Sequence, residues 1–348
     1  MEQIVKLLKS RDKFVIAGHT GPDGDTIGSC LGLAMALAKM GKETIVVLEP
    51  TAPKYHIIPG REYLYHGALE ALSVDVFIAL DCADTERLGA ARVLFNRART
   101  TVCIDHHETN EGFAEYNLID PAASSTAEMV FGVIEALIDV DADIAAAIYS
   151  GMVGDTGGFR YASTSRSTME IAARLMETGI PFTDIYSEML HRHSFEAAKA
   201  FGLALGAACQ AMDGRIVYTF MTREMLVSTG ADSSDMDSVV EYLMNTRGAD
   251  VALFLYERHL NVRDGTSSDD NEANHPENGH KDRGVAPVSE QRKIKVSMRS
   301  KGVHVGRVAA SLGGGGHRMA AGCTMVGTMD GILKQVLEIL ERELETED

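Results

Sequence analysis

The chain has 348 residues, of which 45% are hydrophobic and 24% are charged, and its formal net charge is −17. This length favours two domains, and the apolar fraction is ample for a core in each of them. The acidic excess argues against tight, non-specific binding to long nucleic acid, which needs many lysine and arginine contacts, but it allows a small phosphorylated ligand in a local basic patch.

The five cysteines are scattered along the chain and form no CxxC pair. This pattern is typical of reduced thiols, so we expect a cytoplasmic protein rather than a secreted one. Residues 1–13 mix charged and apolar side chains as an amphipathic helix does, which does not match a signal peptide. No apolar run approaches the roughly 20 residues of a membrane span, so no membrane association is expected.

Strands and helices alternate over the first half of the chain. Short β-branched or apolar runs predict strands at 14–17, 44–48, 74–80 and 101–104. The spacing of apolar residues predicts helices at 1–13, 26–40, 85–97, 124–138, 142–153 and 165–177. This alternation favours an α/β fold with a mostly parallel sheet and right-handed crossovers.

The pattern changes after residues 181–211, which are predicted to be largely helical. Strands are expected at 215–221, 251–256 and 293–299, and helices at 235–245 and 329–345, with a glycine cluster before the last helix. We therefore expect an N-terminal α/β domain over 1–190, a helical connector over 191–212 and a smaller α+β domain over 213–348. The stretch 261–290 has almost no large apolar side chains, which predicts a mobile insertion joining two strands.

Ionisable side chains stand where the predicted strands end. Asp105, His106 and His107 follow the strand at 101–104, and Asp81 follows the strand at 74–80. Adjacent ionisable groups are costly to bury without partners, and in an open α/β sheet the carboxyl ends of the strands are where ligands bind. A hydrogen-bonded turn would explain the triplet alone, whereas a divalent metal would explain it together with the other acidic sites.

Two further sites add to this group. His19, Asp23 and Asp25 lie in a glycine-rich loop after the strand at 14–17, and Asp155 ends a predicted helix beside glycines. All four sites can meet in one cleft if the strands are parallel. Each aspartate alone could cap a helix or lie in a solvated turn, and Asp25 in particular could cap the helix that follows it. Together, this oxygen-rich set suits Mn²⁺ or Mg²⁺ better than a structural zinc ion.

These residues resemble the motifs of a known family. The run GHTGPDGD at 18–25, the strand end at Asp81, the DHH triplet at 105–107 and GDTGG at 154–158 resemble the four motifs of the DHH phosphoesterases. The run GGGGHRMAAG at 313–322 resembles the signature of the DHHA1 domain that often follows. The resemblance spans nearly the whole chain and is nearest to the branch of nanoRNases and 3′-phosphoadenosine 5′-phosphate (pAp) phosphatases. Thr26 stands where a small residue is common, and no consequence of this difference is expected.

The resemblance implies a set of ligands, residue by residue. One ion would be held by His19, Asp23 and Asp81, and the other by Asp25, Asp81, His106 and Asp155, so that Asp81 bridges the two. Asp105 would orient the histidines, and His107 would contact the scissile phosphate or assist the leaving group. The implied cofactor is a pair of Mn²⁺ ions, with Mg²⁺ or Co²⁺ as substitutes, and the implied reaction is hydrolysis by two-metal activation of water.

The second domain has a basic segment of its own. From 291 to 318 there are seven lysines and arginines and no acidic residue. A guanidinium can bind a phosphate with two parallel hydrogen bonds, and a glycine run lets backbone amides approach an anion. For Arg292 and Lys293, a solvated basic face is the preferred interpretation. Substrate contacts across an interdomain cleft are expected from Arg299, Lys301, Gly314, Gly315, His317 and Arg318.

The predicted function is hydrolysis of short oligoribonucleotides (nanoRNA) to nucleoside monophosphates, or of pAp to AMP. The alternatives are a soluble phosphodiesterase of pApA, pGpG or c-di-AMP, a pyrophosphatase-like hydrolase, and a nucleotide-binding sensor without activity. The expected partners are short RNA oligonucleotides or small phosphorylated nucleotides, not long nucleic acid or a membrane. A homodimer is a candidate assembly.

Overall fold

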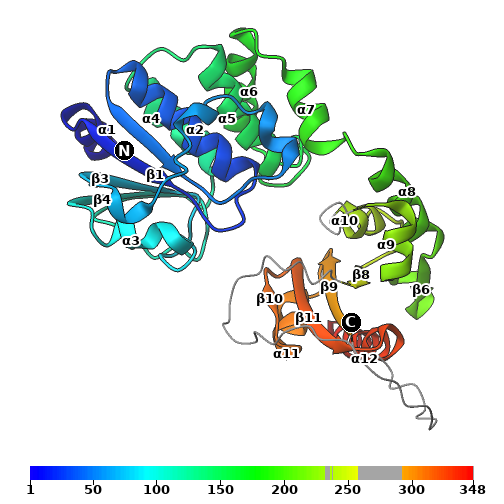
Figure 1. Cartoon of the computed structure of the whole chain (residues 1–348). Helices are drawn as coiled ribbons and strands as arrows, with labels where there is room; N and C mark the ends of the chain where they lie inside the picture. Colours follow the sequence, from blue (N-terminus) through cyan, green and yellow to red (C-terminus); the bar gives the residue numbers. More distant parts are fainter. Residues whose placement is uncertain (232–235, 237, 258–291, 348) are drawn as a thin grey trace, which may run out of the picture. The chain divides into compact units, whose positions relative to one another are not determined.

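The computed structural model describes residues 1–231, 236, 238–257 and 292–347 (Figure 1). It divides into two compact units, Met1–Arg192 and His193–Asp348, and each has its own sheet and hydrophobic core. The insertion predicted at 261–290 lies outside the described residues. Among the helices of the described part of the chain, none combines the length and the apolar character needed to cross a bilayer.

The first unit contains a parallel sheet flanked by helices, as the sequence predicts. Its strands pair in the order β2-β1-β3-β4-β5, and every pairing is parallel. The strands are β1 (Lys13–Ala17), β2 (Glu43–Val47), β3 (Val76–Leu80), β4 (Thr100–Asp105) and β5 (Tyr116–Ile119). The helices are α1 (Glu2–Ser10), α2 (Gly24–Lys39), α3 (Arg92–Phe95), α4 (Thr126–Glu135), α5 (Ala142–Asp155), α6 (Arg166–Glu177) and α7 (Phe182–Leu190).

The two faces of this sheet are covered unequally. Alternate strand residues such as Ile16 and Ile78 pack on the face that carries α2, α4 and α5. Their neighbours, such as Val15 and Phe77, pack against the short helix α3 and the loops beside it. Figure 1 shows the larger group of helices on one side of the strands and α3 on the other. Both faces are therefore buried, which explains why the strands are continuous apolar runs.

Helices α2 and α5 approach each other closely because glycines line their contact. A Cβ atom at Gly28 would lie 2.4 Å from the carbonyl oxygen of Ala147, and one at Gly151 would lie 3.1 Å from Oδ1 of Asp25. Side chains at these positions would separate the two helices. The close approach brings Asp25, in the first turn of α2, toward Asp155, the last residue of α5.

The second unit has a mixed sheet between two layers of helices. Its strands pair in the order β10-β11-β9-β8-β7-β6, with β7 and β8 parallel and the other pairs antiparallel. The strands are β6 (Cys209–Ala211), β7 (Ile216–Met221), β8 (Val251–Glu257), β9 (Arg292–Ser300), β10 (Gly315–Gly316) and β11 (Ala320–Gly327). The helices are α8 (Phe195–Gly206), α9 (Arg223–Thr229), α10 (Ser238–Met244), α11 (Val305–Ser311) and α12 (Met329–Glu347).

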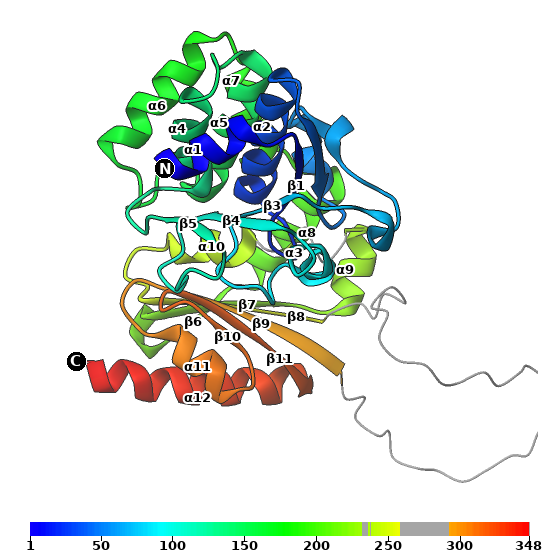
Figure 2. The ribbon, with the colours of Figure 1, turned by 90° about the vertical axis from the view of Figure 1, so that its left-hand side faces the viewer.

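The two faces of this second sheet bury different sets of side chains. Phe254 and its neighbours pack against α8, α9 and α10, whereas Val296 and its neighbours pack against α11 and α12. Figure 2 shows α12 along one face of the sheet and α10 on the other. The alternation along β9 follows the pattern of a strand with one strongly buried face: Ile294, Val296 and Met298 are buried, and Lys293 is exposed.

Two predicted helical stretches were wrong in part. Residues 85–97 form a turn and the 3₁₀ helix Gly89–Ala91 before the short α3, instead of one helix. The Asp84 side chain accepts hydrogen bonds from the amides of Glu86 and Arg87, and Gly89 has a φ of 52°, so the backbone cannot continue as a regular helix there. At the end of the stretch 181–211, residues 209–211 form the strand β6.

Other elements were missed, namely β5, α9, α11, β10 and β11. The strand β11 begins with Ala-Ala-Gly, which has low β-propensity and no clear alternation. It forms because it pairs along its whole length with β9. Pairing with a distant segment of the chain therefore decided this strand, and a local pattern does not reveal such pairing.

Candidate metal centre

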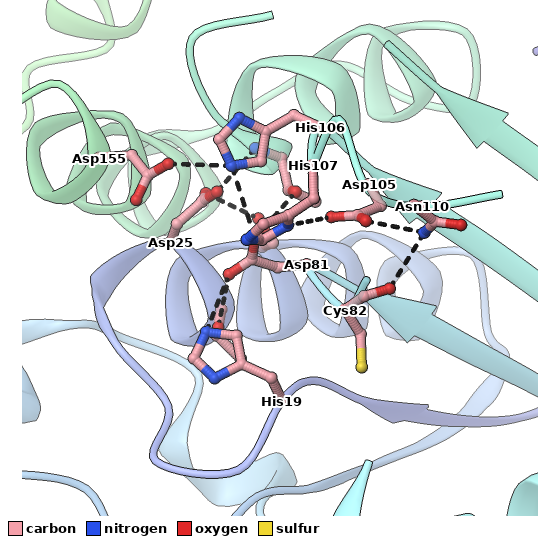
Figure 3. Close-up of polar contacts among 12 residues, drawn as sticks. His19, Asp25, Asp81, Cys82, Asp105, His106, His107, Asn110 and Asp155 are labelled. Atoms are coloured by element: carbon pink, nitrogen blue, oxygen red, sulfur yellow. Dashed lines mark hydrogen bonds and ion pairs between the residues drawn. The ribbon is translucent and has the colours of Figure 1, made fainter. Parts of the chain in front are cut away.

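The predicted ligands converge at the carboxyl edge of the first sheet (Figure 3). Three of the four sites follow β1, β3 and β4, and the fourth ends α5. They come together because the strands are parallel and adjacent, so their carboxyl ends share one edge. Three groups of three side chains each place their ligand atoms within 4.8 Å of one another. These groups are His19–Asp23–Asp81, Asp25–His106–Asp155 and Asp81–His106–His107.

Asp81 lies at the centre of this arrangement. It directly follows β3, is 2% exposed and has a φ of 55°, an unusual backbone conformation for a residue other than glycine. Its Oδ2 atom lies 3.4 Å from Nε2 of His19, and its Oδ1 atom lies 3.8 Å from Nε2 of His106 and 3.8 Å from Nδ1 of His107. The two oxygens of one carboxylate therefore face different histidines.

On the His19 side, Asp23 begins helix α2. Its Oδ1 atom accepts hydrogen bonds from the amides of Asp25 and Thr26, so Asp23, and not Asp25, is the N-cap. Its Oδ2 atom remains 3.7 Å from Nε2 of His19. The cap thus orients one carboxylate oxygen toward the imidazole, and capping and metal binding can share this side chain.

On the other side, Asp25 is fully buried and is held by the start of α4. Its Oδ2 atom accepts from the amide of Thr126 at 2.7 Å, and its Oδ1 atom accepts from the amide of Ala127 at 2.8 Å. Burial, with the charges of Asp81 and Asp155, raises the pKa of the Asp25 carboxyl well above its ordinary value. A positive charge placed here would relieve this repulsion.

His106 joins the same group as Asp25. Its Nε2 atom lies 3.0 Å from Oδ2 of Asp155, and its Nδ1 atom lies 3.4 Å from the carbonyl oxygen of Ala123. Burial lowers the pKa of the imidazole, but Asp155 and Asp25 outweigh it and raise that pKa to about 10. His106 is therefore surrounded by negatively charged carboxylates.

For His19 and Asp155, as for His106, burial and the hydrogen-bonded neighbouring side chains shift the pKa in opposite directions. Burial lowers the pKa of His19, but hydrogen bonds to Asp23 and Asp81 raise it to about 10. Burial raises the pKa of Asp155 even though His106 opposes that shift. Positive charge would therefore stabilise the cluster, and imidazolium groups or a divalent cation can provide it.

The pair Asp105 and His107 forms a separate chain of contacts. Oδ1 of Asp105 lies 2.7 Å from Nδ1 of His107, and Oδ2 accepts a hydrogen bond from Nδ2 of Asn110 at 2.7 Å. Burial raises the pKa of the Asp105 carboxyl, but His107 and Asn110 outweigh it, so the pKa is lowered overall. Asp105 thus orients His107, whereas His106 faces the carbonyl of Ala123 instead.

The donor set fits a divalent metal. Aspartate oxygens and imidazole nitrogens converge at the cluster without a thiolate ligand atom in the three groups found among the described residues. This chemistry suits Mn²⁺ or Mg²⁺ and does not resemble a tetrahedral zinc site closed by cysteine. The cluster is accordingly a binding site for divalent metal.

The predicted substrate residues of the second unit lie at its surface. His317 and Arg318 are exposed, and Arg299, which lies on β9, is partly exposed with a guanidinium nitrogen 3.6 Å from Oε1 of Glu241. The ammonium of Lys301 donates to the carbonyl oxygen of Ala249 at 3.0 Å. This hydrogen bond stabilises the turn that precedes β8.

The glycine cluster has two different kinds of member. A Cβ atom at Gly314 would lie 2.2 Å from the carbonyl oxygen of Gly322, and one at Gly316 would lie 2.6 Å from that of Ala320. Packing between β10 and β11 therefore requires these two glycines. A Cβ atom at Gly315 would meet nothing within 4 Å, so packing does not explain this glycine.

Four residues of the first unit whose side chains contact the cluster were not predicted. The hydroxyl of Ser29 donates to Oδ1 of Asp25 at 3.2 Å. The hydroxyl of Thr26 donates to Oδ2 of Asp81 at 2.6 Å, and that of Thr126 donates to Oδ1 at 3.3 Å. Asn110 binds Asp105, as described above. Thr26 was noted as unusual, and Asn110 follows the triplet closely, so position in a motif was the available signal. Nothing local indicated that Thr126 would reach Asp81.

Comparisons with known proteins agree with these motifs. The model of the DHH family N-terminal domain matches residues 13–152, and that of the DHHA1 domain matches residues 277–346. The chain is 31% identical to the bifunctional oligoribonuclease and PAP phosphatase NrnA of Thermus thermophilus, over 99% of this chain and 94% of that relative. Identity to the Bacillus subtilis protein of the same name is 23%, over 93% and 92% of the two chains.

A solved structure shares the fold of the whole chain. It is an exopolyphosphatase-related protein from Bacteroides fragilis, with 26% sequence identity and a TM-score of 0.81. The match covers 99% of this chain and 95% of that chain. The similarity in sequence and structure therefore extends over both units.

Proposed function

The chain belongs to the DHH family, in the group that carries a DHHA1 domain as well, and from this membership we propose that it hydrolyses short oligoribonucleotides and pAp. The products would be nucleoside monophosphates and AMP. The observation that carries the proposal is the buried Asp81 carboxylate, whose two oxygens face two different groups of histidine and aspartate. The activities named for the two relatives support the choice of substrates.

We propose that the cluster holds two Mn²⁺ ions, with Mg²⁺ or Co²⁺ as substitutes. Two divalent ions in such a site supply an activated water and stabilise the charge that develops on the phosphoryl group. Asp81 would be shared between the ions. His19 and Asp23 would complete the first set of ligands, and the second set would be Asp25, His106 and Asp155.

His107 is proposed to act on the substrate itself. Its Nδ1 atom faces Asp105, which leaves Nε2 available to a phosphate oxygen or to the leaving group. The hydrogen bond to Asp105 raises the pKa of His107, so the ring can carry the proton that Nε2 would donate. The side chain is 28% exposed, so a substrate can reach it.

The second unit is proposed to bind the part of the substrate that does not react. Arg299 and Arg318 offer guanidinium groups, His317 offers an exposed imidazole, and the backbone at Gly315 is open to an anion. Lys301 and Gly314 are proposed to contact the same part of the substrate. A preference for very short substrates fits the net charge of −17, which disfavours binding along a long strand.

A panel of substrates tests this proposal. Purified protein with Mn²⁺ would be assayed on pAp, pApA, pGpG, c-di-AMP, a short RNA and pyrophosphate, with chromatography of the products. We expect AMP from pAp and nucleoside monophosphates from the linear substrates. Turnover confined to c-di-AMP would favour the cyclic phosphodiesterase, and orthophosphate from pyrophosphate alone would favour the pyrophosphatase. Binding without any turnover would favour a nucleotide sensor and refute the proposal.

We also propose that the enzyme works in the cytoplasm, because its cysteines are free thiols. Burial raises the pKa of Cys82 and of Cys103 to about 12, which keeps both of these thiols unreactive beside the metal ligands. The homodimer stays a prediction, and light scattering of the purified protein would test it.

A further inference from the structure

Thr26 contacts two of the three side chains in one ligand group. Its amide donates to Oδ1 of Asp23 at 3.1 Å, and its hydroxyl donates to Oδ2 of Asp81 at 2.6 Å. Both carboxylates belong to the group that includes His19. One buried residue thus binds two carboxylates, and each carboxylate has an oxygen near Nε2 of His19, at 3.7 Å for Asp23 and 3.4 Å for Asp81.

The direction of the Thr26 hydroxyl is fixed by its methyl group. A Cβ atom at Gly18 would lie 2.1 Å from Cγ2 of Thr26, so the methyl occupies the space that a side chain at position 18 would need. A β-branched side chain has few rotamers, and this one is also fully buried. With the methyl packed over Gly18, the hydroxyl is directed at Asp81.

The two oxygens of Asp81 are not held equally. Oδ2, on the His19 side, accepts the short hydrogen bond from Thr26, whereas Oδ1, on the His106 side, accepts a longer one of 3.3 Å from Thr126. Hydrogen bonds to a ligating carboxylate orient it and tune its affinity for metal. The shorter bond will therefore have more influence on the ion of its own side.

We propose that Thr26 is a positioning residue that sets the affinity of the ion bound by His19, Asp23 and Asp81. This inference rests on the proposed two-metal function. It assigns a role to the position at which this chain differs from the common motif, where no consequence was expected. Thr26 would not touch the substrate, and its effect would pass through the two carboxylates.

Three variants separate the hydroxyl from the shape of the side chain. Thr26→Val removes the hydroxyl and keeps the branched shape, so we expect metal at this site to bind about 10- to 100-fold more weakly. Thr26→Ser keeps the hydroxyl and should retain most of the affinity. Thr44→Val is the matched control, because Thr44 is also buried but its hydroxyl donates to the carbonyl of Ala34, away from the cluster.

The measurement is Mn²⁺ binding, followed by the electron paramagnetic resonance signal of free Mn²⁺ and by isothermal titration calorimetry, without substrate. We expect the wild type and Thr44→Val each to bind two ions. The affinities measured for Thr44→Val should match those of the wild type. Thr26→Val should bind one ion normally and the other weakly, and Thr26→Ser should resemble the wild type. Unfolding in EDTA would check that each variant folds.

Several results would overturn the inference. Thr26→Val with two ions of normal affinity would show that the hydroxyl does not matter, and equal weakening of both ions would show that its role is not specific to one site. A serine variant as weak as the valine variant would exclude the hydroxyl as the cause. If Thr26→Val does not fold, Thr26→Ala replaces it in the comparison with serine. Failure of the wild type to bind Mn²⁺ would instead refute the two-metal function itself.

Discussion

In the first unit the central carboxylates of the cluster are buried and hydrogen-bonded within the protein, whereas in the second unit the predicted substrate residues lie at the surface. Asp25 and Asp105 are fully buried, and each has at least two hydrogen-bond partners. His317 and Arg318 are exposed on a loop between β10 and β11. The two units therefore differ in how firmly the protein itself orients their functional side chains.

This difference indicates where the geometry is set in advance. Buried polar groups must be satisfied within the protein, so their orientations are fixed before any ligand arrives. Exposed groups gain their partners from the ligand and lose side-chain freedom when it binds. The first unit would thus determine the chemical step, and the second would contribute to the binding of particular substrates. The following experiments test this division.

The largest effect is expected from Asp81→Asn. The amide keeps the size of the side chain but removes the negative charge shared by both ligand groups, so turnover should fall by a factor on the order of 10⁴ or more. Steady-state rates on pAp and on p-nitrophenyl phosphate would measure it. Asp84→Asn is the control, since Asp84 caps a turn close by and lies outside the three groups of ligands. Near-normal turnover of Asp81→Asn would mean that the bridge is misassigned.

A smaller and selective effect is expected from Arg299→Ala. Loss of one charge-assisted contact of about 1.5–3 kcal/mol corresponds to about a 10- to 150-fold lower kcat/KM. The loss should appear with pAp and dinucleotides and should be much smaller with p-nitrophenyl phosphate, which has no second phosphate or nucleoside. Lys293→Ala, on the same strand, controls for the loss of a positive charge. Equal losses on both kinds of substrate would contradict a separate binding role for the second unit.

Asn110→Ala tests whether the orientation of His107 matters for the chemical step. The change removes a donor to the buried Asp105, and loss of such an orienting contact typically costs about 10- to 100-fold. We expect kcat to fall while Mn²⁺ affinity and KM change little, because neither Asp105 nor His107 is among the proposed metal ligands. Asn117→Ala, which alters an asparagine on β5 away from the cluster, is the control. Loss of Mn²⁺ binding would place Asn110 with the metal ligands instead.

The smallest effect on activity is expected at the glycine cluster, where two neighbouring substitutions should act differently. Gly314→Ala would force β10 from β11 and should lower the free energy of unfolding by about 1–3 kcal/mol. Gly315→Ala has room for its methyl group and should leave stability unchanged while raising KM for pAp severalfold. Urea unfolding and kinetics on both variants would measure this. A normal KM for Gly315→Ala would remove this glycine from the anion site.

The sequence predicted the first unit better than the second, for a physical reason. Strands β1, β3 and β4 are buried on both faces, so each is an apolar run that ends abruptly at a polar residue such as Asp81. Those ends mark the site directly. In the second unit, β11 has little local signal, and its formation depends on pairing with β9.

Within the site, the ligand types could be predicted but their supports could not. The direction of the Thr26 hydroxyl depends on the absence of a side chain at Gly18, and the contact of Thr126 with Asp81 spans segments far apart in the chain. Such contacts follow from close packing and leave no periodic pattern in the sequence. For the same reason, the prediction that Asp105 orients both histidines was too broad. Asp105 contacts His107, whereas His106 faces the carbonyl of Ala123.

The backbone conformation of Asp81 has an evolutionary consequence. With a φ of 55°, this position suits glycine or asparagine better than aspartate, and a buried carboxylate among other carboxylates also costs stability. Asp81→Gly would relieve the backbone strain and the charge repulsion in the metal-free protein, but it would destroy the bridge and leave the hydroxyls of Thr26 and Thr126 without this acceptor. In a duplicated copy released from selection for turnover, replacement of this strained aspartate would no longer be selected against. Glycine or asparagine at the position of Asp81 would then mark descendants that have become pseudoenzymes.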